Sequence, residues 1–162
     1  MTVTYDMITK TTLTSNQTSV TLSSIPNTYT DLVLIINGTY TFSTGVDSFG
    51  IQANGDTGSN HSRLVVSGSG SAVTTGTLTN GSVTLLGLLG AENSTNIINV
   101  QNYSNTTTFK TFLSKATSPS NLIRMGVGLW RSTAAINSLT FDSSGNTFAI
   151  GLSFTLYGIK AE

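Results

Sequence analysis

The only histidine of this sequence is the first residue to consider for acid–base chemistry. His61 lies in the segment Asn60-His61-Ser62-Arg63, next to a stretch rich in turn-forming residues. A Ser-His-Asp catalyst requires a histidine within hydrogen-bond reach of a nucleophile and a carboxylate that orients the ring. No serine motif such as a nucleophile elbow accompanies His61. We therefore expect a surface or turn histidine, no catalytic residues and a protein that is not an enzyme.

Four acidic residues are candidates for a metal site or for a pair of catalytic carboxylates: Asp47, Asp56, Glu92 and Asp142. Calcium prefers several oxygen ligands from carboxylates and carbonyls. The spacing of these residues is not that of an EF-hand, Asn54-Gly55-Asp56 is typical of a turn, and the chain has no cysteine. A carboxylate pair for glycoside hydrolysis would require the fold to bring distant acids together. The sequence therefore predicts no metal and no cofactor.

Arginine and tryptophan are frequent anchors of protein interfaces, and one short segment holds three such residues. In the predicted strand Leu122–Trp130, alternation places the aliphatic residues on one face, which is expected to be core. The opposite face has two glycines between Arg124 and Trp130, a shallow strip that another chain could fill. A lone tryptophan is more often packed inside its own domain, and this interpretation is favoured for Trp130. The interface candidates are Arg124, Trp130 and Arg131, and the expected core row is Ile123, Met125, Val127 and Leu129.

The composition excludes several classes of partner. Charged residues make up 9% of the chain, the formal net charge is zero, and the seven lysines and arginines are scattered. A nucleic-acid binder needs a concentrated basic face, so no nucleic acid is expected. The longest apolar runs, Leu32–Ile36 and Leu85–Leu89, are too short to span a bilayer, and no secretory signal is predicted. A nearly uncharged surface also lacks charge repulsion against self-association, which weakly favours an assembled protein.

Short apolar segments separated by turn residues follow one another along the chain. Asp31–Asn37 carries a continuous apolar run, as in a central strand that is buried on both faces. Asn37-Gly38 and Asn80-Gly81 suit tight turns, because Asn and Gly tolerate positive φ. Strands are predicted at 20–22, 31–37, 48–54, 62–67, 82–88, 96–103, 107–115, 122–130, 136–141 and 148–160.

These elements predict an all-β fold, an antiparallel β-sandwich that is jelly-roll-like. No composition shift marks a second domain, so residues 1–162 are expected to form a single domain. Residues 1–14 are expected to form an N-terminal arm or an edge strand. Ser67–Asn80 is expected to be a flexible loop or a long hairpin, and it could also frame a short strand.

Several segments, in this order along nearly the whole chain, resemble parts of small virion structural proteins of tailed bacteriophages. They are Tyr5-Asp6-Met7-Ile8, Ser24-Ile25-Pro26-Asn27-Thr28-Tyr29-Thr30-Asp31-Leu32-Val33-Leu34, Asn54-Gly55-Asp56-Thr57-Gly58-Ser59-Asn60, Gln101-Asn102-Tyr103-Ser104-Asn105-Thr106-Thr107, Gly128-Leu129-Trp130-Arg131-Ser132 and Phe154-Thr155-Leu156-Tyr157-Gly158-Ile159-Lys160-Ala161. The resemblance implies a β-sandwich component of the phage particle without catalytic residues.

Two roles are compatible with this resemblance. One is a capsid decoration or cement protein, a homo-oligomer and commonly a homotrimer, which binds the outside of the major capsid protein shell and stabilises it. Such a protein would be made in the host cytoplasm and would end on the virion surface. The other is a tail fibre or receptor-binding adhesin domain that binds carbohydrate through Tyr40, Tyr103 or Trp130. The chain has no fibrous repeat and no heptads, which favours the decoration protein.

Overall fold

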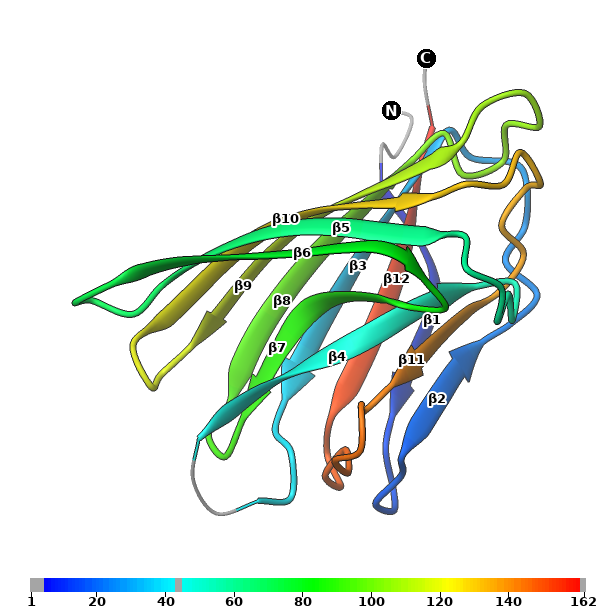
Figure 1. Ribbon diagram of the computed structural model, residues 1–162. Coiled ribbons are helices and arrows are strands. Elements are labelled where there is room, and N and C mark those ends of the chain that lie inside the picture. The colour runs from blue at the N-terminus through cyan, green and yellow to red at the C-terminus, as the bar shows by residue number, and fades with distance from the viewer. Residues whose placement is uncertain (1–4, 43–44, 161–162) are drawn as a thin grey trace.

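Two antiparallel β-sheets pack face to face in the computed structural model, which describes residues 5–42 and 45–160 (Figure 1). The large sheet has the strand order β1-β12-β3-β8-β9-β10-β5-β6, and the small sheet has the order β2-β11-β4-β7. The predicted all-β, jelly-roll-like antiparallel sandwich is thereby confirmed. The strands are β1 (Tyr5–Thr12), β2 (Ser19–Leu22), β3 (Asp31–Gly38), β4 (Val46–Ala53), β5 (His61–Gly68), β6 (Val73–Gly81), β7 (Thr84–Gly90), β8 (Ser94–Gln101), β9 (Lys110–Ser118), β10 (Leu122–Trp130), β11 (Leu139–Asp142) and β12 (Ser153–Ile159).

Strand alternation decides which side chains enter the core. In β12, Phe154 and Leu156 are buried between the sheets, whereas Thr155 and Tyr157 point away from the small sheet. β3 lies between β12 and β8, and its Leu34 and Ile36 are fully buried. The described residues contain no helix that is long and apolar enough to cross a membrane.

Aromatic rings from both sheets meet in the centre of the core. Four of these rings are fully buried: Phe49 of β4, Phe141 of β11, Phe154 of β12, and Phe148, which lies between β11 and β12. Their ring centroids lie 4.9 to 6.4 Å apart in contacting pairs. Buried aromatic pairs each add about 0.5–1.5 kcal/mol to the effect of area burial alone. The core therefore ties segments that are far apart in the sequence into one sandwich.

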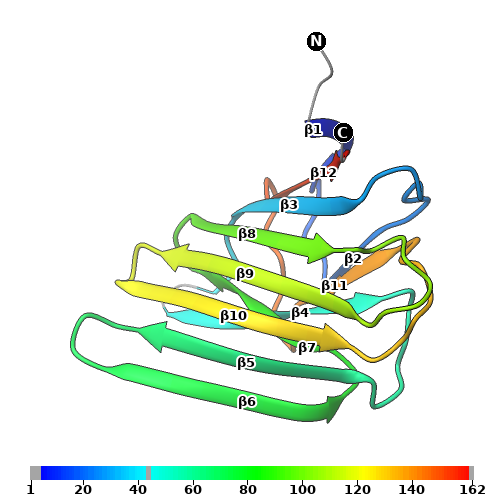
Figure 2. The same ribbon diagram turned by 90° about the horizontal axis from the view of Figure 1, so that it is seen from above.

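Two segments that the sequence left open are strands. Tyr5–Thr12 forms β1, which pairs with β12 at one margin of the large sheet, and residues 1–4 lie outside the described residues. Within the predicted loop or hairpin Ser67–Asn80, residues from Val73 onward form β6, which pairs with β5 at the opposite margin (Figure 2). The sequence of β6 shows no apolar alternation because both faces of this edge strand are largely exposed.

The orientation of β10 is the reverse of the one predicted. Ile123, Met125 and Val127 are exposed on the face that points away from the small sheet, so the row that was expected to be core lies outside. The row with Gly126 and Gly128 faces inward. The reason is close packing: a Cβ atom added to Gly128 would lie 2.6 Å from Thr84 Cγ2 and 2.9 Å from Leu86 Cδ1 of β7. The strip that another chain was expected to fill is therefore filled by β7 of the same chain.

Candidate binding face on the large sheet

The face of the large sheet that points away from the small sheet, here called the outer face, gathers most of the exposed apolar side chains. Of the exposed large hydrophobic residues, all but Phe109 and Ile150 lie on it. Contiguous exposed apolar patches on a protein surface commonly mark interaction sites. Its exposed apolar residues are Tyr5, Met7, Leu64, Val66, Val73, Ile97, Ile123, Met125 and Val127.

The strand register aligns these side chains in rows across neighbouring strands. Val66 of β5 lies opposite Met125 of β10, which lies opposite Lys115 of β9, which lies opposite Ile97 of β8. Side chains directly opposite each other on one face of an antiparallel pair are in contact distance. The centre of the outer face is therefore a mostly aliphatic surface, in which Lys115 is the charged residue. A second row runs beside the first through Leu64, Val127 and Leu113.

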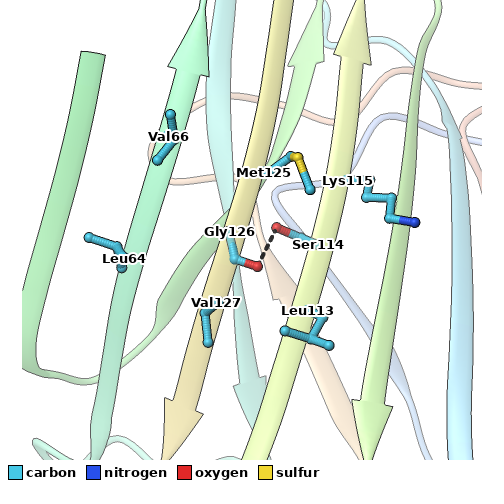
Figure 3. Close-up of a pocket in the computed structure, with 8 residues that line it drawn as sticks. All are labelled: Leu64, Val66, Leu113, Ser114, Lys115, Met125, Gly126 and Val127. Atoms are coloured by element: carbon cyan, nitrogen blue, oxygen red, sulfur yellow. Dashed lines mark hydrogen bonds between the residues drawn. The ribbon is translucent and has the colours of Figure 1, made fainter. Parts of the chain in front are cut away.

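A shallow hollow of about 260 Å³ lies in this surface (Figure 3). Leu64 and Val66 of β5 line one side, Leu113 of β9 lines the other, and Met125 and Val127 of β10 lie between them. The lining is almost entirely aliphatic and includes no aromatic ring. Such a hollow fits aliphatic side chains of another protein, whereas a sugar site would present rings and convergent polar groups.

Lys115 is the only charged side chain among the outward-facing residues of β5, β8, β9 and β10. Lys115 is one of the residues that line the hollow, and Figure 3 shows its side chain extending from β9 toward β8. The one ion pair within the described residues, Lys160 Nζ to Asp6 Oδ2 at 3.0 Å, does not involve it. Because the centre of the outer face carries so little charge, a partner can cover it without removing several ions from water.

The predicted interface residue Arg124 points into the sandwich. Its Nε donates to Ser67 Oγ at 3.0 Å, and its Nη1 donates to Ser48 Oγ of β4 at 2.6 Å. The guanidinium therefore connects the two sheets of its own domain, and burial lowers its pKa. These contacts leave Arg124 as a partly buried bracing residue.

Trp130 and Arg131 fasten the loop between β4 and β5 to the end of β10. Trp130 is only 2% exposed, and its Nε1 donates to Asp56 Oδ2 at 2.7 Å. This hydrogen bond, with those from Asn60 and the Gly58 N–H, lowers the pKa of the Asp56 carboxyl. Arg131 donates to the Ser59 carbonyl at 2.8 Å and also to Ser62 Oγ and Asn80 Oδ1. The interface role of these residues stays a prediction, and for Trp130 it would require the ring to leave its site.

His61 is buried rather than exposed, so the expectation of a surface or turn histidine is wrong. It is the first residue of β5, faces inward and stacks on Trp130 with ring centroids 6.4 Å apart. Neither ring nitrogen has a hydrogen-bond partner in the described part of the chain. Burial lowers the pKa of His61, and the nearby Asp56 carboxylate offsets part of that effect. The turn-rich residues before His61 concealed that a strand begins at this position.

Two of the acidic residues considered as metal ligands, Asp47 and Asp142, accept hydrogen bonds from the turn that follows β11. Asp47 accepts from Asn146 Nδ2 at 3.0 Å, and Asp142 accepts from the Ser144 N–H at 2.7 Å. Among residues 5–42 and 45–160, no three His, Cys, Asp or Glu side chains lie close enough together to hold a metal ion.

The aromatic residues considered for carbohydrate binding are also buried. Tyr40, Tyr103 and Trp130 are at most 2% exposed, so none presents its ring to a sugar, and this expectation is wrong. A more accessible aromatic pair lies on the outer face: Tyr5 of β1 is 54% exposed and packs edge-on against the half-buried Tyr157 of β12, with ring centroids 6.4 Å apart. The sequence missed this pair because the pairing of the two terminal strands is not visible in it.

No family profile matches the sequence, and no curated protein matches it. Among solved structures, an exo-inulinase from Aspergillus awamori superposes with a TM-score of 0.51 at 14% identity, covering 96% of this chain and 29% of the inulinase chain. The chain thus spans less than a third of that enzyme, and the likeness shows the fold alone. Two further matches cover nearly whole chains. They are galectin LEC-6 of Caenorhabditis elegans (TM-score 0.44, 9% identity, 91% and 94% covered) and the Ruminococcus gnavus IT-sialidase CBM40 bound to α2,3-sialyllactose (0.41, 12%, 97% and 95%).

Proposed function

We propose that this chain is a non-enzymatic assembly protein that attaches to a protein shell through its outer face. The specific role is decoration of a tailed-phage capsid, in which the chain binds the outside of the major capsid protein and stabilises the shell. The observation that supports the attachment is the aliphatic, nearly uncharged centre of the outer face over β5, β10 and β9. The resemblance of the sequence to small phage virion proteins supports the choice of shell.

The chemistry of the outer face suits a stable protein contact. The centre of a protein interface is apolar and poor in charge, and each Å² of apolar surface removed from water contributes about 25 cal/mol. A domain that binds only the assembled shell adds its binding free energy to the shell and so opposes its opening. The homotrimer that the resemblance implies would place several outer faces on one group of capsid subunits.

The test is co-sedimentation with heads of the phage that encodes this chain, assembled without it. We expect saturable binding at a fixed stoichiometry and a higher temperature of head disruption. Val127→Asp places a carboxylate in the middle of the outer face and is expected to weaken binding at least tenfold, because an unpaired charge is costly to bury.

Ile150→Asp is the matched control, because Ile150 is the exposed aliphatic residue that lies off the outer face in the loop before β12. It is expected to bind as the unchanged protein does. Circular dichroism spectra of both variants serve as the check that each is folded. Equal binding by Val127→Asp and Ile150→Asp would show that the outer face is not the contact, and no saturable binding at all would remove the decoration role.

A receptor-binding adhesin is the second candidate, and the pair formed by the exposed Tyr5 and the half-buried Tyr157 favours it. Aromatic rings at an exposed edge can stack on sugar rings. The expected result for this role is micromolar binding on a glycan array that Tyr157→Ala abolishes and Val127→Asp leaves intact. Binding to host cells but not to heads, lost with the same tyrosine change, would establish the adhesin in place of the decoration protein.

A further inference from the structure

The edge strand β6 presents its main chain to solvent without protection. It forms one margin of the large sheet, and no element lies beyond it (Figure 2). From Val73 to Leu78 it pairs with β5 in regular register, and Val73–Gly81 contains neither a charged residue nor a proline. Within the described residues, no hydrogen bond outside the pairing with β5 reaches the main chain of this regular stretch. Its outward N–H and C=O groups are therefore free to pair with another strand.

The edge strand β7 of the small sheet shows how this protein covers an edge. Asn96 of β8 accepts from the Leu88 N–H at 2.8 Å and donates to the Leu88 carbonyl at 2.7 Å. Ser94 Oγ accepts from the Gly90 N–H at 3.1 Å. Side chains of the large sheet thus take the place of a neighbouring strand along β7. No such side chain serves β6 in the described structure.

The remaining two edges are blunted in other ways. β1 has an irregular register between Met7 and Thr9, carries Lys10 and holds the Asp6–Lys160 ion pair. β2 is only four residues long. Bulges, charges and short length are the usual devices that prevent a sheet edge from pairing with another chain. Among the four edges, β6 is the longest, and it has neither the charges of β1 nor the side-chain cover of β7.

We propose that β6 pairs antiparallel with β6 of a second copy of this chain, which joins two large sheets about a twofold axis. An antiparallel edge is complementary to itself, because the same strand turned by the twofold presents the same alternating donors and acceptors. No charge on β6 meets a like charge in such a pair, and opposed threonines are favourable cross-strand neighbours.

The contact also extends the outer face. Val73 and Thr75 lie on the same side of the large sheet as Leu64 and Val66. Pairing of the two β6 strands therefore places the two outer faces side by side as one apolar surface. This twofold contact gives a dimer, which differs from the trimer that the sequence resemblance implies. The molar mass of the oligomer in solution therefore distinguishes the two.

The test is sedimentation equilibrium of the purified chain from micromolar to millimolar concentration. We expect a reversible monomer–dimer equilibrium. The double change Thr75→Lys and Thr77→Lys brings like charges together across the new strand pair and is expected to raise the dimer dissociation constant at least tenfold. Thr117→Lys is the matched control, since Thr117 lies on the same face in β9, which is paired on both sides.

A cross-linking measurement gives an independent readout. Because the chain has no cysteine, Thr75→Cys introduces a single thiol on β6, and Thr117→Cys introduces one away from it. A short bis-maleimide is expected to join Thr75→Cys into covalent dimers and to leave Thr117→Cys monomeric. A monomer over the whole concentration range, a trimer, or a dimer that persists in the double-lysine variant while Val127→Asp disrupts it would each overturn the proposal.

Discussion

At the residue scale, His61 is the side chain whose chemistry the fold changes most. The ring is fully buried against Trp130, and neither nitrogen is paired within the described residues. A proton added to a buried imidazole is poorly solvated, so the folded protein holds the neutral form and the pKa lies below the model-peptide value of 6.5. The residue therefore makes the stability of the fold depend on pH.

The sign of this effect follows from proton uptake. Because the unfolded chain binds a proton at His61 more readily than the folded chain, its contribution to stability is fully present above pH 6.5 and is lost as the pH falls toward the folded-state pKa. We expect the free energy of unfolding, measured by urea denaturation, to decrease from pH 7.5 to pH 5. The pKa of Asp56 is lowered from 3.8, so its contribution to stability is fully present above that pH and is lost only at still lower pH.

His61→Leu removes the titrating group and is the informative comparison. The variant lacks the titrating imidazole and is expected to keep the same free energy of unfolding from pH 7.5 down to pH 5. An unchanged slope of stability against pH in His61→Leu would assign the acid sensitivity to another group.

At the element scale, β10 packs against the small sheet with one face and forms part of the outer face with the other. Its glycines lie against β7, where the two sheets come close, and its aliphatic residues lie in the outer face. Arg124 and Trp130 hold the two ends of the inward row by hydrogen bonds to Ser48 and Asp56. A single strand thus positions the candidate binding face and closes the sandwich behind it.

Gly128→Ala tests the close approach at β10. The added methyl group would lie within 3.0 Å of side-chain carbons of Thr84 and Leu86, so these side chains or the strands that carry them must shift. We expect a loss of about 1–3 kcal/mol in the free energy of unfolding, as for other overpacked cores. Val127→Thr, on the outward side of the same strand, is the control and is expected to change stability by less than about 0.5 kcal/mol. Equal effects of the two changes would contradict the assigned orientation of β10.

At the scale of the whole molecule, the pairing of β1 with β12 brings the two ends of the chain together in one sheet. The core is shared in the same way, because Phe49, Phe141 and Phe154 come from strands of both sheets and from distant parts of the sequence. Neither sheet can bury its apolar face without the other, so the two are expected to unfold together.

Calorimetry checks this expectation and the predicted single domain. One transition is expected, with the calorimetric enthalpy equal to the van't Hoff enthalpy. Gly128→Ala should shift the whole transition to lower temperature rather than split it. Two separate transitions would divide the chain into independent units.

The sequence by itself determined the β class and most strand positions, because a period of two and turn residues are local signals. It also directed attention to β10, although it assigned the wrong row to the core. Alternation separates the two faces of a strand but does not state which face meets the second sheet.

Only the tertiary structure decided that choice, together with the burial of His61, Tyr40 and Tyr103 and the exposure of the aliphatic rows. Each depends on which strands become neighbours: β7 packs on the glycines of β10, and β1 joins β12. The outer face and the free edge of β6 exist because eight strands pair in one sheet while four cover it. Such surfaces arise from long-range pairing, and no local pattern in the sequence encodes them.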